Sequence, residues 1–121
     1  MTVQDQLREA LSRAPHFTER EHNKTFTVQN PVYEVLYGGG SRDARGFRHR
    51  WHVIIWGGPV IVPNAEEVLS LAMRRAADAV LPLDCVIPQS IEVSMEAPIN
   101  TDYKFTRGVI VCDEAEIDND G

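Results

Sequence analysis

Cysteines and long apolar runs are scarce in this sequence of 121 residues. The two cysteines, Cys85 and Cys112, form no spaced motif, which argues against a disulfide-rich scaffold and a cysteine-based zinc site. We expect both to be small apolar fillers in a reducing compartment, and the sequence leaves a disulfide between them open. The longest apolar stretch, residues 53–62, is interrupted by glycine and proline and is much shorter than the roughly 20 residues of a membrane-spanning helix.

Positive charge is in the minority, since 12 basic residues stand against 18 acidic ones and the formal net charge is -6. Five of the acidic residues lie in the last nine positions, so the rest of the chain is close to neutral, which weakens the case for a nucleic-acid-binding protein. Residues 113–121 contain one large apolar side chain and predict a disordered acidic tail. The first five residues lack the charged and apolar character of a secretory leader, so we expect an intracellular protein.

Signatures of metal binding and catalysis are missing as well. His49 and His52 point to opposite faces of a predicted strand, and no His-Glu-x-x-His or Cys-x-x-Cys spacing occurs. The glycine run at 38–40 is not followed by the lysine and the helix that a phosphate-binding loop requires. No Gly-x-Ser-x-Gly motif occurs, and nothing near Cys85 indicates a lowered thiol pKa. We therefore expect no enzyme, no metal site and no cofactor.

Hydrophobic periodicity predicts six elements. Thr2 and Asp5 are placed to cap the first helix, and Asn64 and Glu67 to cap the second. The elements are a helix over 3–14, strands over 32–37 and 47–56, a helix that follows Asn64 and ends before Pro82, and strands over 91–95 and 103–112. This order predicts one α+β domain over residues 1–112, in which two helices pack on one face of an antiparallel sheet of about four strands.

Two strands carry informative side-chain patterns. Alternation over 91–95 directs Ile91, Val93 and Met95 inward and the glutamates outward. In the strand over 47–56, the far end is apolar on both faces, so we expect both faces to be covered there. The glycine run at 38–40 is expected to end the preceding strand and to open a long, charged hairpin tip.

Arginines and aromatic residues around this hairpin form the candidate site. Three interpretations stand side by side: an anion or nucleic-acid contact, a solvated face, and a docking loop for acidic patches on a partner, of which we favour the last. Trp51 and Trp56 fall on opposite faces of their strand, so we expect at least one of them to lie outside the main core, where it would either serve a subunit interface or be covered by the first helix. The candidate interface residues are Arg42, Arg45, Arg48, Arg50, Trp51, Trp56, Tyr33 and Tyr37.

The order and punctuation of these elements resemble the tail-terminator proteins of long-tailed bacteriophages. The resemblance covers residues 3–112 and is carried by three features. They are the strand Arg48-His49-Arg50-Trp51-His52-Val53-Ile54-Ile55-Trp56 with its closing Gly-Gly-Pro, the capped helix near Asn64, and the closing pair of strands from Ser90-Ile91-Glu92-Val93 to Arg107-Gly108-Val109-Ile110-Val111.

The resemblance implies a structural protein of the virion, assembled in the host cytoplasm. It implies a homo-hexameric ring at the head-proximal end of the tail tube, which ends tube growth and joins the tail to the head. The implied partners are a second copy of the chain, the major tail tube protein and the connector proteins of the neck, with DNA passing through the ring and no membrane. Two alternatives stay open: another neck component, such as a head-completion or stopper protein, and a small nucleic-acid-binding module that uses the arginine-rich loop 42–50.

Overall fold

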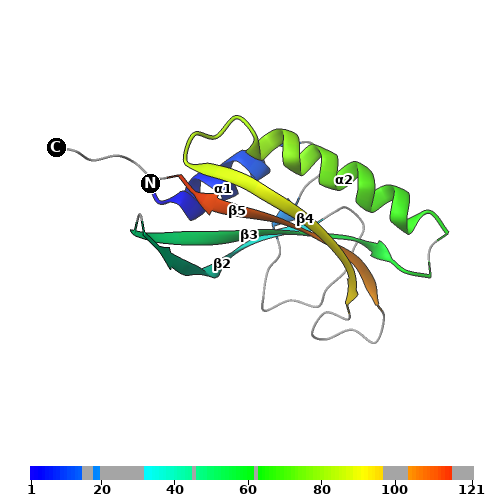
Figure 1. The fold of residues 1–121 in the computed structure, drawn as a ribbon. Helices are drawn as coiled ribbons and strands as arrows, with labels where there is room; N and C mark the ends of the chain where they lie inside the picture. The colour runs from blue at the N-terminus through cyan, green and yellow to red at the C-terminus, as the bar shows by residue number, and fades with distance from the viewer. Residues whose placement is uncertain (15–17, 20–31, 45, 62, 97–103, 116–121) are drawn as a thin grey trace.

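A computed structural model describes residues 1–14, 18–19, 32–44, 46–61, 63–96 and 104–115. Its elements are α1 (Val3–Ser12), β1 (Thr18–Glu19), β2 (Val32–Asp43), β3 (Gly46–Pro59), α2 (Ala65–Val80), β4 (Val86–Glu96) and β5 (Phe105–Glu114) (Figure 1). The predicted α+β class and the order of two helices and four main strands are confirmed.

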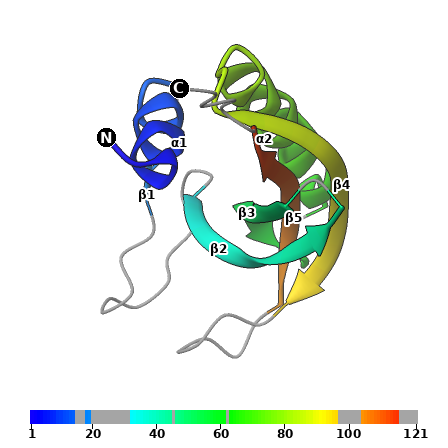
Figure 2. The ribbon, with the colours of Figure 1, turned by 60° about the vertical axis from the view of Figure 1, so that its left-hand side comes forward.

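The sheet has the strand order β1-β2-β3-β5-β4. The four main strands pair antiparallel, and both helices lie over one face of the sheet (Figures 1 and 2). The two-residue β1 adds a short parallel partner to the start of β2. The sequence did not predict β1, because a strand of two residues is too short to show side-chain alternation. The outer edge of the sheet on the opposite side is formed by β4.

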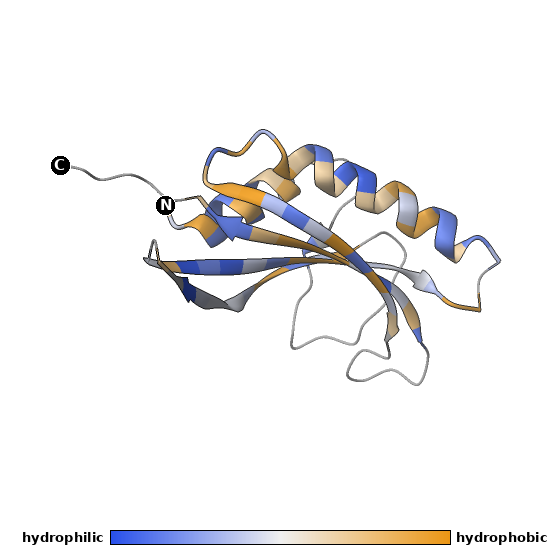
Figure 3. Cartoon of the chain, in the orientation of Figure 1, coloured by the Kyte–Doolittle hydropathy of each residue, from blue (hydrophilic) through white to orange (hydrophobic). Residues whose placement is uncertain are grey.

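The main core lies between the helices and the sheet. Leu7 and Leu11 of α1 and the apolar stripe of α2 meet Val53 and Ile55 of β3, and all of these side chains are buried. Helical spacing places the apolar residues of α2 on one side, and Figure 3 shows hydrophilic residues on its outward side. The core therefore sits over the central strands β3 and β5, which α2 covers directly.

The two helix starts differ from each other. At α1 the predicted capping box is present: Asp5 N–H donates to Thr2 Oγ1 at 3.1 Å, and Thr2 N–H donates to the Asp5 carboxylate at 3.2 Å. Hydrogen bonds to the Asp5 carboxylate from the side chain and then the backbone of Thr2 lower the pKa of Asp5. At α2, Asn64 is the capping residue by position, but its side chain makes no capping hydrogen bond, so that prediction was wrong. Glu66 and Glu67 still lie in the first turn, where the helix dipole favours negative charge.

The glycine run does not end a strand. β2 continues through it to Asp43, with a register shift between Tyr37 and Gly40 and a positive φ of 88° at Gly39. A Cβ at Gly40 would overlap the Phe47 ring, so glycine lets the ring lie across the hairpin. The long tip loop that we predicted is therefore replaced by a tight turn between Asp43 and Gly46.

The last strand extends further than its pattern indicated. β5 ends at Glu114, so Asp113 and Glu114, which we had placed in the acidic tail, belong to the sheet. Arg50 Nε donates to Asp113 Oδ1 at 3.2 Å across the β3–β5 pair, which explains how an acidic residue is held in the strand. Residues 116–121 of the predicted tail lie outside the described part of the chain.

A second apolar cluster lies on the other face of the sheet. Ile54 and Trp56 are buried there, which confirms that the end of β3 is covered on both faces. The Arg107 guanidinium lies over the Trp56 ring at 5.5 Å from its centroid. The cluster consists of Val32, Ile54, Trp56, Phe105, Val109 and Val111.

Candidate functional site

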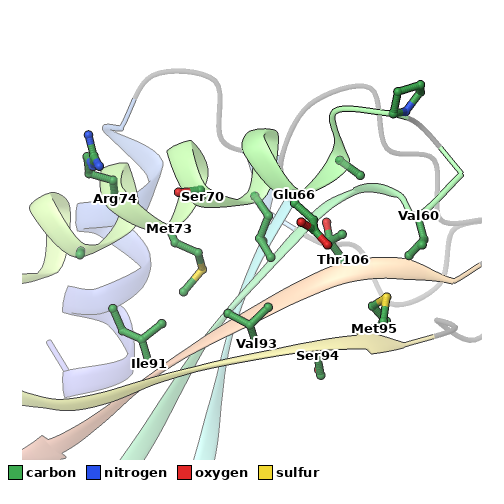
Figure 4. Close-up of a pocket in the computed structure, with 14 residues that line it drawn as sticks. Val60, Glu66, Ser70, Met73, Arg74, Ile91, Val93, Ser94, Met95 and Thr106 are labelled. Carbon is green, nitrogen blue, oxygen red and sulfur yellow. The ribbon is translucent and has the colours of Figure 1, made fainter.

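An apolar groove of about 930 Å³ lies between α2 and β4 (Figure 4). Helix α2 contributes Leu69 and Met73, and β4 contributes the side chains that point back toward the helix. We call this the α2–β4 groove. Its main apolar lining is Val60, Leu69, Met73, Ile91, Val93 and Met95.

The groove exists because α2 covers β3 and β5 but leaves the edge strand uncovered. At Gly108 of β5, a Cβ would lie 2.8 Å from Met73 Cε and 2.9 Å from Met73 Cγ, so the glycine lets α2 pack close to the centre of the sheet. The edge strand β4 then projects beyond the helix. Its alternation is as predicted, but Ile91, Val93 and Met95 are 57%, 67% and 59% exposed rather than buried.

Charge is sparse in the α2–β4 groove. Glu66 and Arg74 are the ionisable residues among those that line it, and they stand eight positions apart on α2, which is about 12 Å along a helix. Figure 4 shows Glu66 near Thr106 and Val60, with Arg74 at the other end. Two opposite charges so far apart do not form an acid–base pair, so the groove is suited to holding apolar side chains.

The turn end of the β2–β3 hairpin carries a second exposed surface. The Tyr37 hydroxyl and His49 Nδ1 share a hydrogen bond at 2.7 Å, and the Tyr37 and Trp51 rings meet edge to face at 5.2 Å. Phe47 packs against His49 at 4.9 Å between ring centroids. Tyr37 is 50% exposed and Phe47 is 56% exposed. We call the four side chains the hairpin cluster: Tyr37, Phe47, His49 and Trp51.

The predicted arginine cluster is divided by the pleat of the hairpin. Arg42 pairs with Phe47 in register, so the two share one face, whereas Arg48 and Arg50 alternate onto the other face. Arg42 is exposed, Arg48 is half-buried, and Arg50 pairs with Asp113. Arg45 lies outside the described residues. The arginines that can be placed therefore form no continuous basic patch, which weakens the nucleic-acid interpretation.

The four aromatic candidates also separate. Tyr37 and Trp51 belong to the hairpin cluster, but Tyr33 lies in the main core and Trp56 in the second apolar cluster, and both are buried. Burial raises the pKa of the Tyr33 hydroxyl. The proposed interface role of Tyr33 and Trp56 therefore does not fit their burial. Sequence reasoning missed Phe47 because it was taken as an ordinary member of the strand, although an aromatic residue beside a turn was available as a signal.

The described residues offer no nucleophile with a lowered pKa. Cys85 and Cys112 are both free thiols. Burial raises the pKa of Cys85, and it raises the pKa of Cys112 to about 11, so neither forms the thiolate readily at neutral pH. Over the same ranges, no three histidine, cysteine or acidic side chains come together in a way that could bind a metal ion. Neither α1 nor α2 is long and apolar enough to cross a membrane.

The chain matches no protein-family model, and no curated protein is detectably similar to it. Its function must therefore be argued from the two surfaces described above. Both are apolar, exposed and built on regular secondary structure.

Proposed function

We propose that this protein is a structural component of a phage virion that assembles with itself into a ring. The specific role proposed is that of a tail terminator, which forms a hexamer at the head-proximal end of the tail tube, ends tube growth and joins the tail to the head. The observation that carries the proposal is the presence of two different exposed apolar surfaces on one small domain, the α2–β4 groove and the hairpin cluster.

A ring with cyclic symmetry needs two different contact surfaces on each subunit. A ring of more than two identical subunits requires each subunit to present one surface to the next copy and a different surface to the previous copy. The turn of the β2–β3 hairpin lies at the opposite end of the molecule from the start of α2 (Figure 1). Two surfaces placed so far apart allow each copy to contact two neighbours at once, as a ring demands.

The exposed side chains also have the composition of an interface. Aromatic residues and methionine are enriched in the buried centres of protein interfaces, whereas lysine and glutamate are depleted. The hairpin cluster supplies tyrosine, phenylalanine and tryptophan, and the groove supplies two methionines, Met73 and Met95. Leaving such residues exposed costs hydration free energy that association would recover.

Native mass spectrometry of the purified chain over a wide concentration range tests self-assembly. We expect a closed oligomer of six copies. A second assay adds the protein to polymerising tail tube protein and measures tube length by electron microscopy, where we expect shorter tubes with one capped end.

The two assays separate the candidate roles. A chain that stays monomeric and leaves tube length unchanged would refute the terminator. A ring that binds isolated head connectors but not tube ends would assign the protein to another neck role.

A further inference from the structure

We propose that the α2–β4 groove receives the hairpin cluster of a second copy of this chain, with Arg42 of the incoming hairpin placed against Glu66. This inference rests on the proposed self-assembly and specifies the contact that would build the ring.

The groove is suited to receive an inserted part rather than a flat surface. It is concave, with α2 forming one wall and the exposed side chains of β4 the other (Figure 4). Ile91, Val93 and Met95 follow one another on the same side of β4, so they form a continuous apolar row along the edge strand. The part of β4 that lines the groove, from Ile91 to Met95, spans about 13 Å, which is wider than two paired strands.

The hairpin has the complementary shape and chemistry. Its turn end is narrow, because two strands joined by a tight turn occupy about 10 Å across. Phe47 and Tyr37 present exposed rings on the face that the hairpin cluster occupies. Mutual contacts with His49 and Trp51 fix both rings, so inserting them costs little side-chain entropy.

Charge favours this pairing of surfaces over two hairpin clusters pairing with each other. Arg42 lies on the same face as Phe47, and Glu66 lies among the groove residues near Val60. Two hairpin clusters facing each other would bring Arg42 near a second Arg42, whereas the groove brings it the Glu66 carboxylate. The carboxylate and the guanidinium can form a bidentate pair at the rim of the contact.

The occupancy of the two sheet edges also favours this pairing of surfaces. On β2, β1 pairs with the first two residues, and Gln4 Nε2 donates to the Val35 carbonyl at 2.9 Å, so this edge is partly occupied. The register shift at Tyr37 interrupts the rest of it. In the described part of the chain, no strand pairs with the outer edge of β4. The unpaired edge strand is therefore β4, the strand that also lines the groove. The hairpin cluster would contribute side chains to the contact and not an unpaired strand edge.

Two single variants, each blocking one surface, test the contact. Val93→Asp places a charge in the groove, and Phe47→Asp places one in the hairpin cluster. Because both residues are more than half exposed, both variants should fold, which circular dichroism and thermal melting verify. Each is expected to weaken self-association by about 30-fold or more. Leu71→Asp is the matched control, since Leu71 is 48% exposed on α2 and does not line the groove.

Mixing the two variants gives the decisive reading in native mass spectrometry. Val93→Asp keeps an intact hairpin and Phe47→Asp keeps an intact groove, so an equimolar mixture should form a one-to-one heterodimer that grows no further. Each variant alone should be monomeric, and Leu71→Asp should assemble like the original chain. Met95→Asp with Tyr37→Asp provides a second pair if either first variant fails to fold.

The other results overturn the inference in distinguishable ways. If both variants assemble normally, the contact uses other surfaces and the ring itself still stands. If Phe47→Asp assembles alone while Val93→Asp does not, the groove binds something other than the hairpin. If the original chain stays monomeric at every concentration, the inference and the self-assembly that it rests on fail together.

Discussion

The close approach of α2 to the sheet at Gly108 makes a quantitative prediction about Gly108→Ala. The added methyl group would lie within 3 Å of Met73 Cγ and Cε, a separation that carbon atoms do not tolerate, so the helix or the methionine must shift. Overpacking of this kind costs about 1–3 kcal/mol. Alanine is favoured over glycine in a strand by about 0.5–1 kcal/mol. We therefore expect a net loss of about 0–2.5 kcal/mol in the free energy of unfolding.

The partner variant Met73→Ala turns this into a double-mutant cycle. Met73 is buried but lies at the border of the open groove, so truncating it should cost about 2 kcal/mol, the low end of the range for buried methionines. With the methionine gone, the methyl group of Gly108→Ala meets no obstacle. The double variant should therefore be more stable than the sum of the single changes predicts, by a coupling energy of about 1–3 kcal/mol, which is the overpacking cost that is relieved.

Urea unfolding followed by tryptophan fluorescence measures all four proteins at one concentration. Gly58→Ala is the matched control, because a Cβ there meets nothing within 4 Å and its φ is not in the left-handed region. Because nothing obstructs the added methyl group, the control should raise stability by about 0.5–1 kcal/mol. A neutral Gly108→Ala with no coupling to Met73→Ala would refute the close packing of α2 on β5, and with it the reason given for the uncovered edge strand.

Three further predictions concern the helix start, the thiols and the hairpin. Thr2→Ala should lower stability by about 1 kcal/mol and raise the pKa of Asp5, which NMR titration of the carboxylate reports; an unchanged pKa would exclude the capping box. Burial raises the pKa of Cys112 to about 11 from about 9, so its contribution to stability is complete below pH 9 and is lost as the pH rises through 11; Cys112→Ala should flatten that decline in urea unfolding curves. Arg50→Ala should cost less than about 1 kcal/mol and less still in high salt, because the pair with Asp113 is partly exposed; a larger loss in chemical denaturation would contradict this.

Much of the fold was predictable because periodicity carries the information. The stripe that contains Leu7 and Leu11, and the alternation along β3, each identify an element and its buried side. The ends of the strands were harder to predict than their existence. β2 continues through three glycines because Gly40 is required beneath Phe47, a contact between distant positions that no local pattern reveals. Asp113 belongs to β5 because it pairs with Arg50 of β3 and Ile87 of β4, and strand pairing is again a tertiary effect.

The candidate site was only partly predictable, for a related reason. Counting arginines between 42 and 50 identified a region but not its faces, and pairing in the hairpin then divided Arg42 from Arg48 and Arg50. Tyr33 and Trp56 are aromatic residues on strands, which is equally typical of a core and of an interface. Burial distinguishes the two cases, and burial depends on which strand is central and which helix covers it.

Strands β3 and β4 have equally clear alternation but differ in what covers their apolar side. Side-chain alternation states which side of a strand is apolar, but it does not state what covers that side. For β3 the cover is α2, whereas for Ile91, Val93 and Met95 the helix stops short and the same pattern remains exposed. An apolar row on an edge strand that no described residue of its own domain covers is a liability unless something else covers it. The contrast between these two strands, which have equally clear patterns, is therefore the strongest reason to look for the cover of β4 on another molecule.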